Sequence, residues 1–363
     1  MRPTPDGSTL DAAMQRPRRH MNVCASVPSS GVPFGIRSAS AALAALWLAM
    51  WLQLETPRWA AWTVMALALP TRGQVGRKGL WRVGGTILGL GAGLAGVAGF
   101  AQDSLAMGTF VALWFALNAY VGGRLPGLAS YGAALSGLTA GLIVALSATD
   151  PGSALEIALA RGAEIVLGVG CVYVASALAE IAQGSPPARA SAPPTVLPSA
   201  EMVTANAVRA FLVVAVAWAI WVTTAWPSGG LFVVFAGVVS VVFVTMPDGD
   251  LRARDYLWGA ALGQATGLVV KYALLSSSSS FEMLAAVLFP FLLIGGIGMT
   301  DQRKVALTLG YNLSFLIALE PRNPMQYDLA ASLNEAAAVF AGIAFGVLAF
   351  RVVFPYRIWR GMR

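Results

Sequence analysis

Residues 57–93 read PRWAAWTVMALALPTRGQVGRKGLWRVGGTILGLGAG. Two apolar runs lie on either side of a basic segment: the first ends at Pro70, and the second continues through repeated glycines beyond Gly93. A helix crosses the hydrocarbon of a bilayer with about 20 apolar residues, a length that the second run reaches and the shorter first run approaches. The stretch therefore predicts two membrane helices joined by a basic loop that faces lipid headgroups.

The composition of the whole chain is that of a protein surrounded by lipid. Its 363 residues are 57% hydrophobic and 11% charged, with a mean hydropathy of +0.69. A soluble globular protein carries about 25% charged residues. So few charges leave too little polar surface to face water, and the fold class predicted is an all-α membrane protein.

Apolar runs of similar length recur along the chain and predict about twelve transmembrane helices. In the first half they cover residues 38–54, 58–69, 83–101, 105–121, 125–148 and 154–181. In the second half they cover residues 205–226, 229–246, 256–275, 281–299, 305–319 and 329–354.

The remaining segments divide the chain into five parts. Residues 1–35 are rich in Pro, Ser, Gly and Arg and are predicted to form a disordered cytoplasmic arm, which a start at Met21 would shorten. Residues 36–182 and 204–356 hold the two membrane repeats, and residues 357–363 form a cytoplasmic tail. Residues 183–203 carry too many Pro and Ser residues to span a membrane, and they predict a cytoplasmic linker.

The positions of Lys and Arg give the chain an orientation. With the N-terminus in the cytoplasm, all but four of the 24 basic residues fall in cytoplasmic segments. Arg58 and Arg322 lie on the opposite side, and Arg161 and Lys271 lie within spans, where Lys271 is expected to snorkel to the interface. Because basic residues are retained inside, we predict a multi-pass protein of the cell inner (cytoplasmic) membrane with both termini cytoplasmic.

Small residues recur at the same offset in the two halves. The third span carries Gly85, Thr86, Gly89 and Gly93, and the ninth span carries Gly259, Gly263 and Gly267 at matching positions. Six helices per half return the chain to the same side, so the pattern predicts two parallel six-helix repeats. Glycines spaced four residues apart make a flat stripe on which another helix can pack closely.

The quoted stretch resembles the fusaric acid resistance and aromatic acid exporter family, and more distantly the plant aluminium-activated malate channels. The shared pattern is a Trp-Ala entry, a Thr-Val run ending in Pro, a basic loop, and an Arg followed by spaced Gly and Thr. The residues that match it are Trp59, Ala60, Thr63, Val64, Pro70, Arg82, Gly85, Thr86 and Gly89. The family's members carry sizeable soluble domains after each helix set, so the chain resembles the membrane part of such a protein.

Ionisable groups within spans are costly and usually face a cavity or a partner. Arg161 and Glu164 lie one turn apart and can pair locally, and the repeat offset places Glu335 opposite Arg161, which predicts a second ion pair between the halves. We expect a substrate or ion path here, with Arg161 attracting an organic anion and Glu164 or Glu335 exchanging a proton. A purely structural pair is the alternative reading.

Uncharged polar and aromatic side chains are weaker candidates for the same path. Three amides fall within or beside spans, where they either bond neighbouring helices or hold a substrate hydroxyl: Asn118, Asn312 and Asn334. Trp59 and Trp62 fit the aromatic belt at a membrane interface.

Several function classes are excluded. The single histidine, His20, and two distant cysteines offer no metal site. No cofactor motif or catalytic triad is present, so the chain is not expected to be an enzyme. The basic residues are spread over loops on one side of the membrane, which speaks against nucleic acid.

The resemblance implies an inner-membrane efflux transporter that exports aromatic carboxylic acids or similar small organic anions, driven by protons. A passive organic-anion channel and a non-transporting membrane subunit of a larger efflux complex are the alternatives. Membrane lipid and a small organic anion are the partners expected, and a homodimer and a periplasmic adaptor protein are left open.

Overall fold

The computed structural model describes residues 31–184, 197–244, 246, 248–275 and 280–355. The predicted arm up to residue 30, the centre of the predicted linker at 185–196 and the predicted tail at 357–363 lie outside these residues. Within the described residues the secondary structure is helical, without a β-strand. The prediction of an all-α protein is confirmed.

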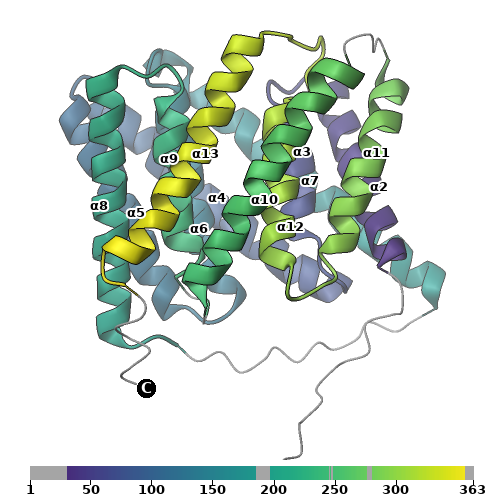
Figure 1. Cartoon of the computed structure of the whole chain (residues 1–363), viewed down its shortest axis with the longest axis horizontal. Helices are drawn as coiled ribbons and strands as arrows, with labels where there is room; N and C mark the ends of the chain where they lie inside the picture. The colour runs from purple at the N-terminus through teal and green to yellow at the C-terminus, as the bar shows by residue number, and fades with distance from the viewer. Residues whose placement is uncertain (1–30, 185–196, 245, 247, 276–279, 356–363) are drawn as a thin grey trace, which may run out of the picture. The chain divides into compact units, whose positions relative to one another are not determined.

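Twelve α-helices follow one another in the described part of the chain (Figure 1). The first six are α2 (Val32–Trp51), α3 (Arg58–Leu67), α4 (Arg72–Phe100), α5 (Ser104–Arg124), α6 (Leu128–Leu146) and α7 (Ala154–Gln183), with a 3₁₀ turn η1 (Pro151–Ser153) before α7. The next six are α8 (Ala200–Thr224), α9 (Gly229–Val242), α10 (Gly249–Val269), α11 (Phe281–Gly298), α12 (Val305–Leu319) and α13 (Leu329–Val352). A π-helical turn, η2 (Val270–Leu274), extends α10.

The helices differ in length and hydropathy, and only some of them are long and apolar enough to cross a membrane. In the described residues, eight are long and apolar enough: α2, α4, α5, α6, α7, α8, α11 and α13. The helices α9 and α12 are apolar but shorter, and α3 has only 10 residues. The protein is therefore a multi-pass membrane protein with eight candidate spans, and the remaining four helices do not meet this criterion.

Four helices, α2, α4, α8 and α10, begin five or more residues earlier than predicted, because hydropathy locates only the lipid-facing part of a helix. Helix α2 starts at Val32, inside the predicted arm, where Pro33 occupies the first turn, a position that suits proline. Helix α4 starts at Arg72, so the predicted basic loop is helical, and the Thr71 hydroxyl caps it by accepting from the Gln74 amide. Helix α8 starts at Ala200, inside the predicted linker, with the Ser199 hydroxyl as its cap.

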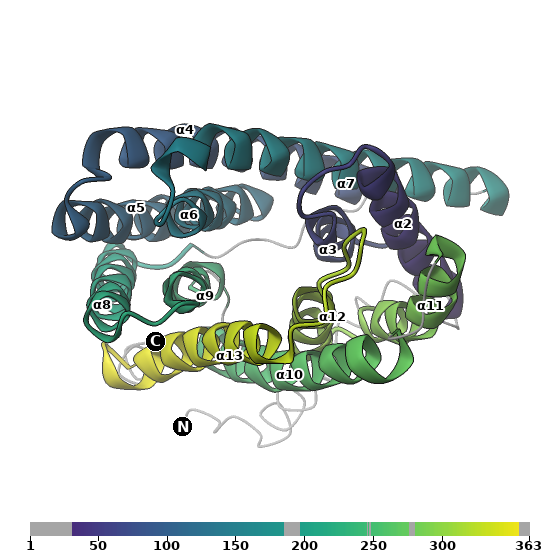
Figure 2. The ribbon, with the colours of Figure 1, turned by 90° about the horizontal axis from the view of Figure 1, so that it is seen from above.

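The helices of the two halves pack in corresponding pairs (Figure 2). Helix α4 packs on α6 as α10 packs on α12, and α3 packs on α7 as α9 packs on α13. Between the halves, α5 contacts α8 as α11 contacts α2, and α6 contacts α9 as α12 contacts α3. The short helices α3, α9 and α12 thus lie against other helices, which shield them from lipid.

The glycine stripes lie where backbones approach most closely. A Cβ atom on Gly85 would collide with the Gly132 carbonyl of α6, and one on Gly89 would lie 2.6 Å from the Ser136 carbonyl oxygen. In the second half, a Cβ atom on Gly259 would collide with the Leu307 carbonyl of α12. Gly263 and Gly267 likewise face backbone carbonyls of α12, whereas Gly93 faces the Ile143 side chain of α6. These close approaches need residues without a side chain.

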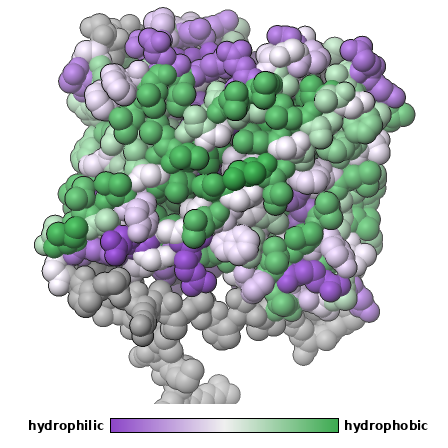
Figure 3. All heavy atoms as spheres, turned by 180° about the vertical axis from the view of Figure 1, so that it is seen from behind, coloured by the Kyte–Doolittle hydropathy of each residue, from purple (hydrophilic) through white to green (hydrophobic). Residues whose placement is uncertain are grey.

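The outer surface is apolar over its middle (Figure 3). Hydrophobic side chains cover the central part of the face shown there, and hydrophilic side chains gather towards its two edges. Large apolar residues with more than half of their surface exposed occur on several helices: Leu80, Ile87, Leu88, Leu105, Leu159, Ile181, Trp258 and Leu262. Such a surface is suited to hydrocarbon rather than to water.

We expect Gly85→Ala to destabilise the protein and Gly84→Ala to leave it unchanged or slightly stabilised. Both substitutions replace glycine within α4, which favours the helix, but only Gly85 faces the Gly132 carbonyl, whereas nothing lies within 4 Å of a Cβ atom on Gly84. Overpacking of this kind costs about 1–3 kcal/mol. Thermal unfolding in one detergent measures both, and equal melting temperatures would contradict the close helix contact.

Candidate functional site

Charged side chains are buried where α3 begins. Arg58, the first residue of α3, is 7% exposed. Its guanidinium lies 3.3 Å from the Glu320 carboxylate and 3.6 Å from the Glu335 carboxylate, and it donates a hydrogen bond to the Ile317 carbonyl. Arg58 therefore joins α3 to α13 and to the end of α12.

Glu320 is the centre of this group of charges. It follows α12 in a left-handed conformation, with φ at 48°. Besides Arg58, it pairs with Lys271 at 3.3 Å and with Arg322. Burial raises the pKa of Glu320, but Arg58, Arg322 and Lys271 outweigh it and lower the pKa below the usual value. The three cations therefore favour the ionised form of this carboxylate.

Lys271 does not extend to the surface of the protein, as the predicted snorkelling requires. It lies in η2 and is 1% exposed, and its ammonium group donates to the Ser332 hydroxyl at 2.9 Å as well as to Glu320. Tyr272 donates to the same hydroxyl. A carboxylate within reach inside the protein removes the need to snorkel, so this prediction was wrong.

Arg161 and Glu164 form a buried pair on α7, at 3.5 Å. Glu164 also accepts hydrogen bonds from the backbone amide and hydroxyl of Thr56, at 3.0 and 2.7 Å. The Arg161 guanidinium lies over the Trp59 ring, 3.7 Å from its centroid, and its Nη2 atom has no hydrogen-bond partner among the described residues. The expected local pair is thus present, inside the protein.

The predicted ion pair between Arg161 and Glu335 is not found among the described residues. Glu335 pairs with Arg58, and the ring of Trp59 covers Arg161 instead. The sequence offset between the halves could not predict these partners, because they come from α3, which places Arg58 beside Glu335 and Trp59 beside Arg161.

The three amides form hydrogen bonds with neutral groups of the protein. The Asn118 amide donates to the Trp114 carbonyl of its own helix, and the Asn312 amide donates to the Gly295 carbonyl of α11. Asn334 accepts from the Trp226 indole and donates to the Ser228 hydroxyl. Among the described residues these amides bond only to neutral groups and not to the buried charges, which favours the packing interpretation.

A second pair of cations, Lys78 and Arg82, lies on α4 and contacts residues of α3. The sequence pattern predicts a loop at this place. Arg82 of α4 is 2% exposed, and it donates to the Tyr131 and Thr63 hydroxyls, both at 2.9 Å. Lys78, one turn earlier, is half-buried and donates to the Ala66 carbonyl. The spacing of Lys78 and Arg82 by one helical turn was the available signal, but it could be read only once the segment was known to be helical.

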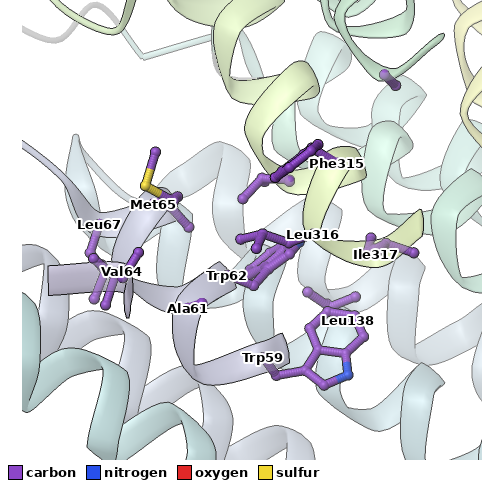
Figure 4. Close-up of a cluster of buried hydrophobic side chains, with 14 of the residues drawn as sticks. Trp59, Ala61, Trp62, Val64, Met65, Leu67, Leu138, Phe315, Leu316 and Ile317 are labelled. Carbon is purple, nitrogen blue, oxygen red and sulfur yellow. The ribbon is translucent and has the colours of Figure 1, made fainter. Parts of the chain in front are cut away.

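Buried apolar side chains cluster around α3 (Figure 4). Trp59 and Trp62 of α3 lie beside Leu138 of α6 and Leu316 of α12, and the two indoles are 5.5 Å apart. Both tryptophans are buried, at 4% and 5% exposure, so they do not belong to an interfacial belt as predicted. Helices α2, α7 and α12 enclose α3 and keep it from the interface.

The arrangement is suited to binding an anion. Around α3 and η2 four cations, Arg58, Arg161, Lys271 and Arg322, face three carboxylates. Buried guanidinium groups bind carboxylates through paired hydrogen bonds, and the Trp59 ring offers a stacking face. No cluster of metal-binding side chains occurs in the described residues.

Comparison with known proteins identifies the family. The profile of the fusaric acid resistance protein family matches residues 32–192 and again residues 177–360. The chain belongs to this family. The two matches lie one after the other, one on each set of six helices.

Relatives in this family include named transporters. The p-hydroxybenzoic acid efflux pump subunit AaeB of Salmonella paratyphi A is 31% identical over 162 residues, which is 42% of this chain and 25% of the relative. An uncharacterised transporter of Gluconobacter oxydans is 30% identical over 151 residues, which is 42% of this chain and 20% of the relative. The matches thus span a fifth to a quarter of the relatives' length. No solved structure matches the chain.

Arg58→Gln is expected to lower the thermal stability of the protein more than Arg322→Gln. Both side chains pair with Glu320, but the Arg58 side chain is 8% exposed and the Arg322 side chain is 32% exposed. Breaking a buried ion pair from one side costs about 3–5 kcal/mol, whereas water replaces an accessible partner at a smaller cost. Equal losses of melting temperature in the same detergent would contradict the central position of Arg58.

Proposed function

We propose that the protein is a transporter of the cell inner membrane that exports aromatic carboxylic acids or similar small organic anions from the cell. Family membership supports transport, and the name of the Salmonella relative supports an aromatic acid as the substrate class. The observation that carries the proposal is the buried Arg161, which presents a free N–H group beside the Trp59 ring. An aromatic carboxylate fits both features.

We propose that export is coupled to protons. Glu164 is fully buried and lies 3.5 Å from Arg161, so an anion that binds Arg161 competes with this carboxylate. Protonation of Glu164 would release the guanidinium to the substrate, and deprotonation would restore the ion pair. Glu335, half-buried beside Arg58, is the second candidate for proton exchange.

The two sets of helices are proposed to be parallel repeats, at residues 36–182 and 204–356. Two observations support this layout: the family profile matches twice in succession, and the helix contacts occur in corresponding pairs. A pseudo-twofold axis along the membrane normal would relate the sets. A periplasmic adaptor protein is a proposed partner, because the relative is named as a pump subunit.

The orientation can be tested with single cysteines in a cysteine-free background. We expect Thr149→Cys, in the turn before η1, to react from outside the cell with a membrane-impermeant maleimide, and Glu201→Cys, at the start of α8, to react only after lysis. Both positions are exposed and lie at opposite ends of α7 and the following linker. The reverse labelling pattern would overturn the cytoplasmic placement of the termini.

Transport itself is tested with full-length protein in proteoliposomes. Uphill export of p-hydroxybenzoate that collapses with a protonophore is expected; flux that only follows the gradient would indicate a channel, and no flux would indicate a non-transporting subunit. Arg161→Gln should reduce the flux at least about 10-fold, because it leaves Glu164 buried without its charge partner and removes the anion site. Arg124→Gln, at an exposed cation of α5, is the control. Unchanged export by Arg161→Gln at normal protein level would refute the anion role.

A further inference from the structure

The cations Lys78 and Arg82 differ from Arg58, Arg161 and Lys271 in having only neutral partners among the described residues. The structure gives Arg58, Arg161 and Lys271 a carboxylate each, at 3.3 to 3.5 Å. Neither Lys78 nor Arg82 has a carboxylate within 4.0 Å among the described residues. Their hydrogen bonds go to hydroxyl groups and a backbone carbonyl. A cation buried without a counter-charge is costly, and an anion bound beside it would offset that cost.

Both cations point to the same aromatic surroundings. Lys78 lies over the Tyr131 ring, 4.7 Å from its centroid, and the same tyrosine accepts a hydrogen bond from Arg82. The Arg82 guanidinium lies over the Trp62 ring at 5.0 Å. The two charges are therefore held together by α3 and α6, although both belong to α4.

Buried donors in this region lack partners. The Arg82 Nε and Trp62 Nε1 atoms have no hydrogen-bond partner among the described residues, and Arg82 and Trp62 are 2% and 5% exposed. The Thr86 hydroxyl, one turn beyond Arg82 on α4, also has no hydrogen-bond partner among the described residues, and Thr86 is 3% exposed. A carboxylate can accept from several such donors at once, and the flat indole suits an aromatic ring.

We propose that Lys78, Arg82 and Trp62 form a binding site for the carboxylate of an aromatic anion, with Arg82 held in place by Tyr131 and Thr63. The site rests on the proposed export function and would receive the substrate on the side of the membrane where α4 begins. The carboxylate takes a paired contact with Arg82, with Lys78 as the second charge. Trp62 and Trp59 separate this site from Arg161, so an anion passes from one cationic site to the next along an aromatic surface.

Benzoate binding to the purified full-length protein tests this site, with calorimetry as the measurement. Arg82→Gln should weaken benzoate binding at least about 10-fold, since it removes hydrogen bonds to a charged group. Arg77→Gln, an exposed cation on the same helix, should leave it unchanged. Benzamide, which has the same shape without the charge, should bind weakly to every variant and show no such difference.

A structural role for Arg82 predicts different results. If Arg82 served only to hold α3 to α4, the double variant Thr63→Val, Tyr131→Phe would remove the same hydrogen bonds and weaken binding as strongly as Arg82→Gln. The proposed site predicts that the double variant still binds benzoate, because both cations stay. Should Arg82→Gln fail to fold, Lys78→Gln is measured in its place, with at least a severalfold loss expected.

The outcomes separate this site from the proposed function. If the wild-type protein exports p-hydroxybenzoate and Arg82→Gln binds benzoate as tightly as the wild type, the site is refuted and the export function stands. If the wild-type protein neither binds nor transports any aromatic acid, the proposed function fails and this site fails with it.

Discussion

Charge balance without water constrains the rest of this structure. Lipid cannot solvate a guanidinium or a carboxylate, so each charge at membrane depth needs a partner inside the protein. Glu320 meets this requirement for Arg58, Lys271 and Arg322 at once. These cations belong to separate elements, α3, η2 and the segment after α12, so one carboxylate fixes how their ends meet. Where a cation has no such carboxylate, as at Arg82, the protein surrounds it with hydroxyl groups and an aromatic face.

The short helices can exist because longer ones cover them. Helix α3 is buried at every residue, and its length is far below that of a bilayer. The Ala66 carbonyl at its end accepts a hydrogen bond from Lys78, and the Leu69 carbonyl just beyond the helix accepts one from Arg37. An interior helix of this kind does not itself need to span the hydrocarbon, and its polar ends can serve as places where a charged solute is held.

Much of the fold could be predicted from the sequence, because a helix in contact with lipid needs a run of apolar residues, and such runs can be found in the sequence. The helices follow the predicted order, and the glycines at 85 and 259 lie at the closest helix contacts. The site could be predicted only in part. The local pair of Arg161 and Glu164 follows from helical spacing, but Glu335 pairs with Arg58 because of how α3 enters the bundle. Such contacts depend on the packing of segments that are far apart in the chain. Neither the hydropathy of a segment nor the sequence offset between the two halves gives information on this packing.

The starts of the two equivalent short helices, α3 and α9, are held in different ways. At the start of α3 the bundle is held by the charges of Arg58, whereas at the start of α9 neutral hydrogen bonds link Trp226 and Ser228 to Asn334. Under the proposed duplication, the two halves have therefore lost their interchangeability. A chain assembled from two copies of the first half would contain Arg58 twice. It would lack Glu320, which belongs to the second half, so neither arginine would have this carboxylate as a partner. At this place the charge of the first half is balanced by carboxylates of the second half.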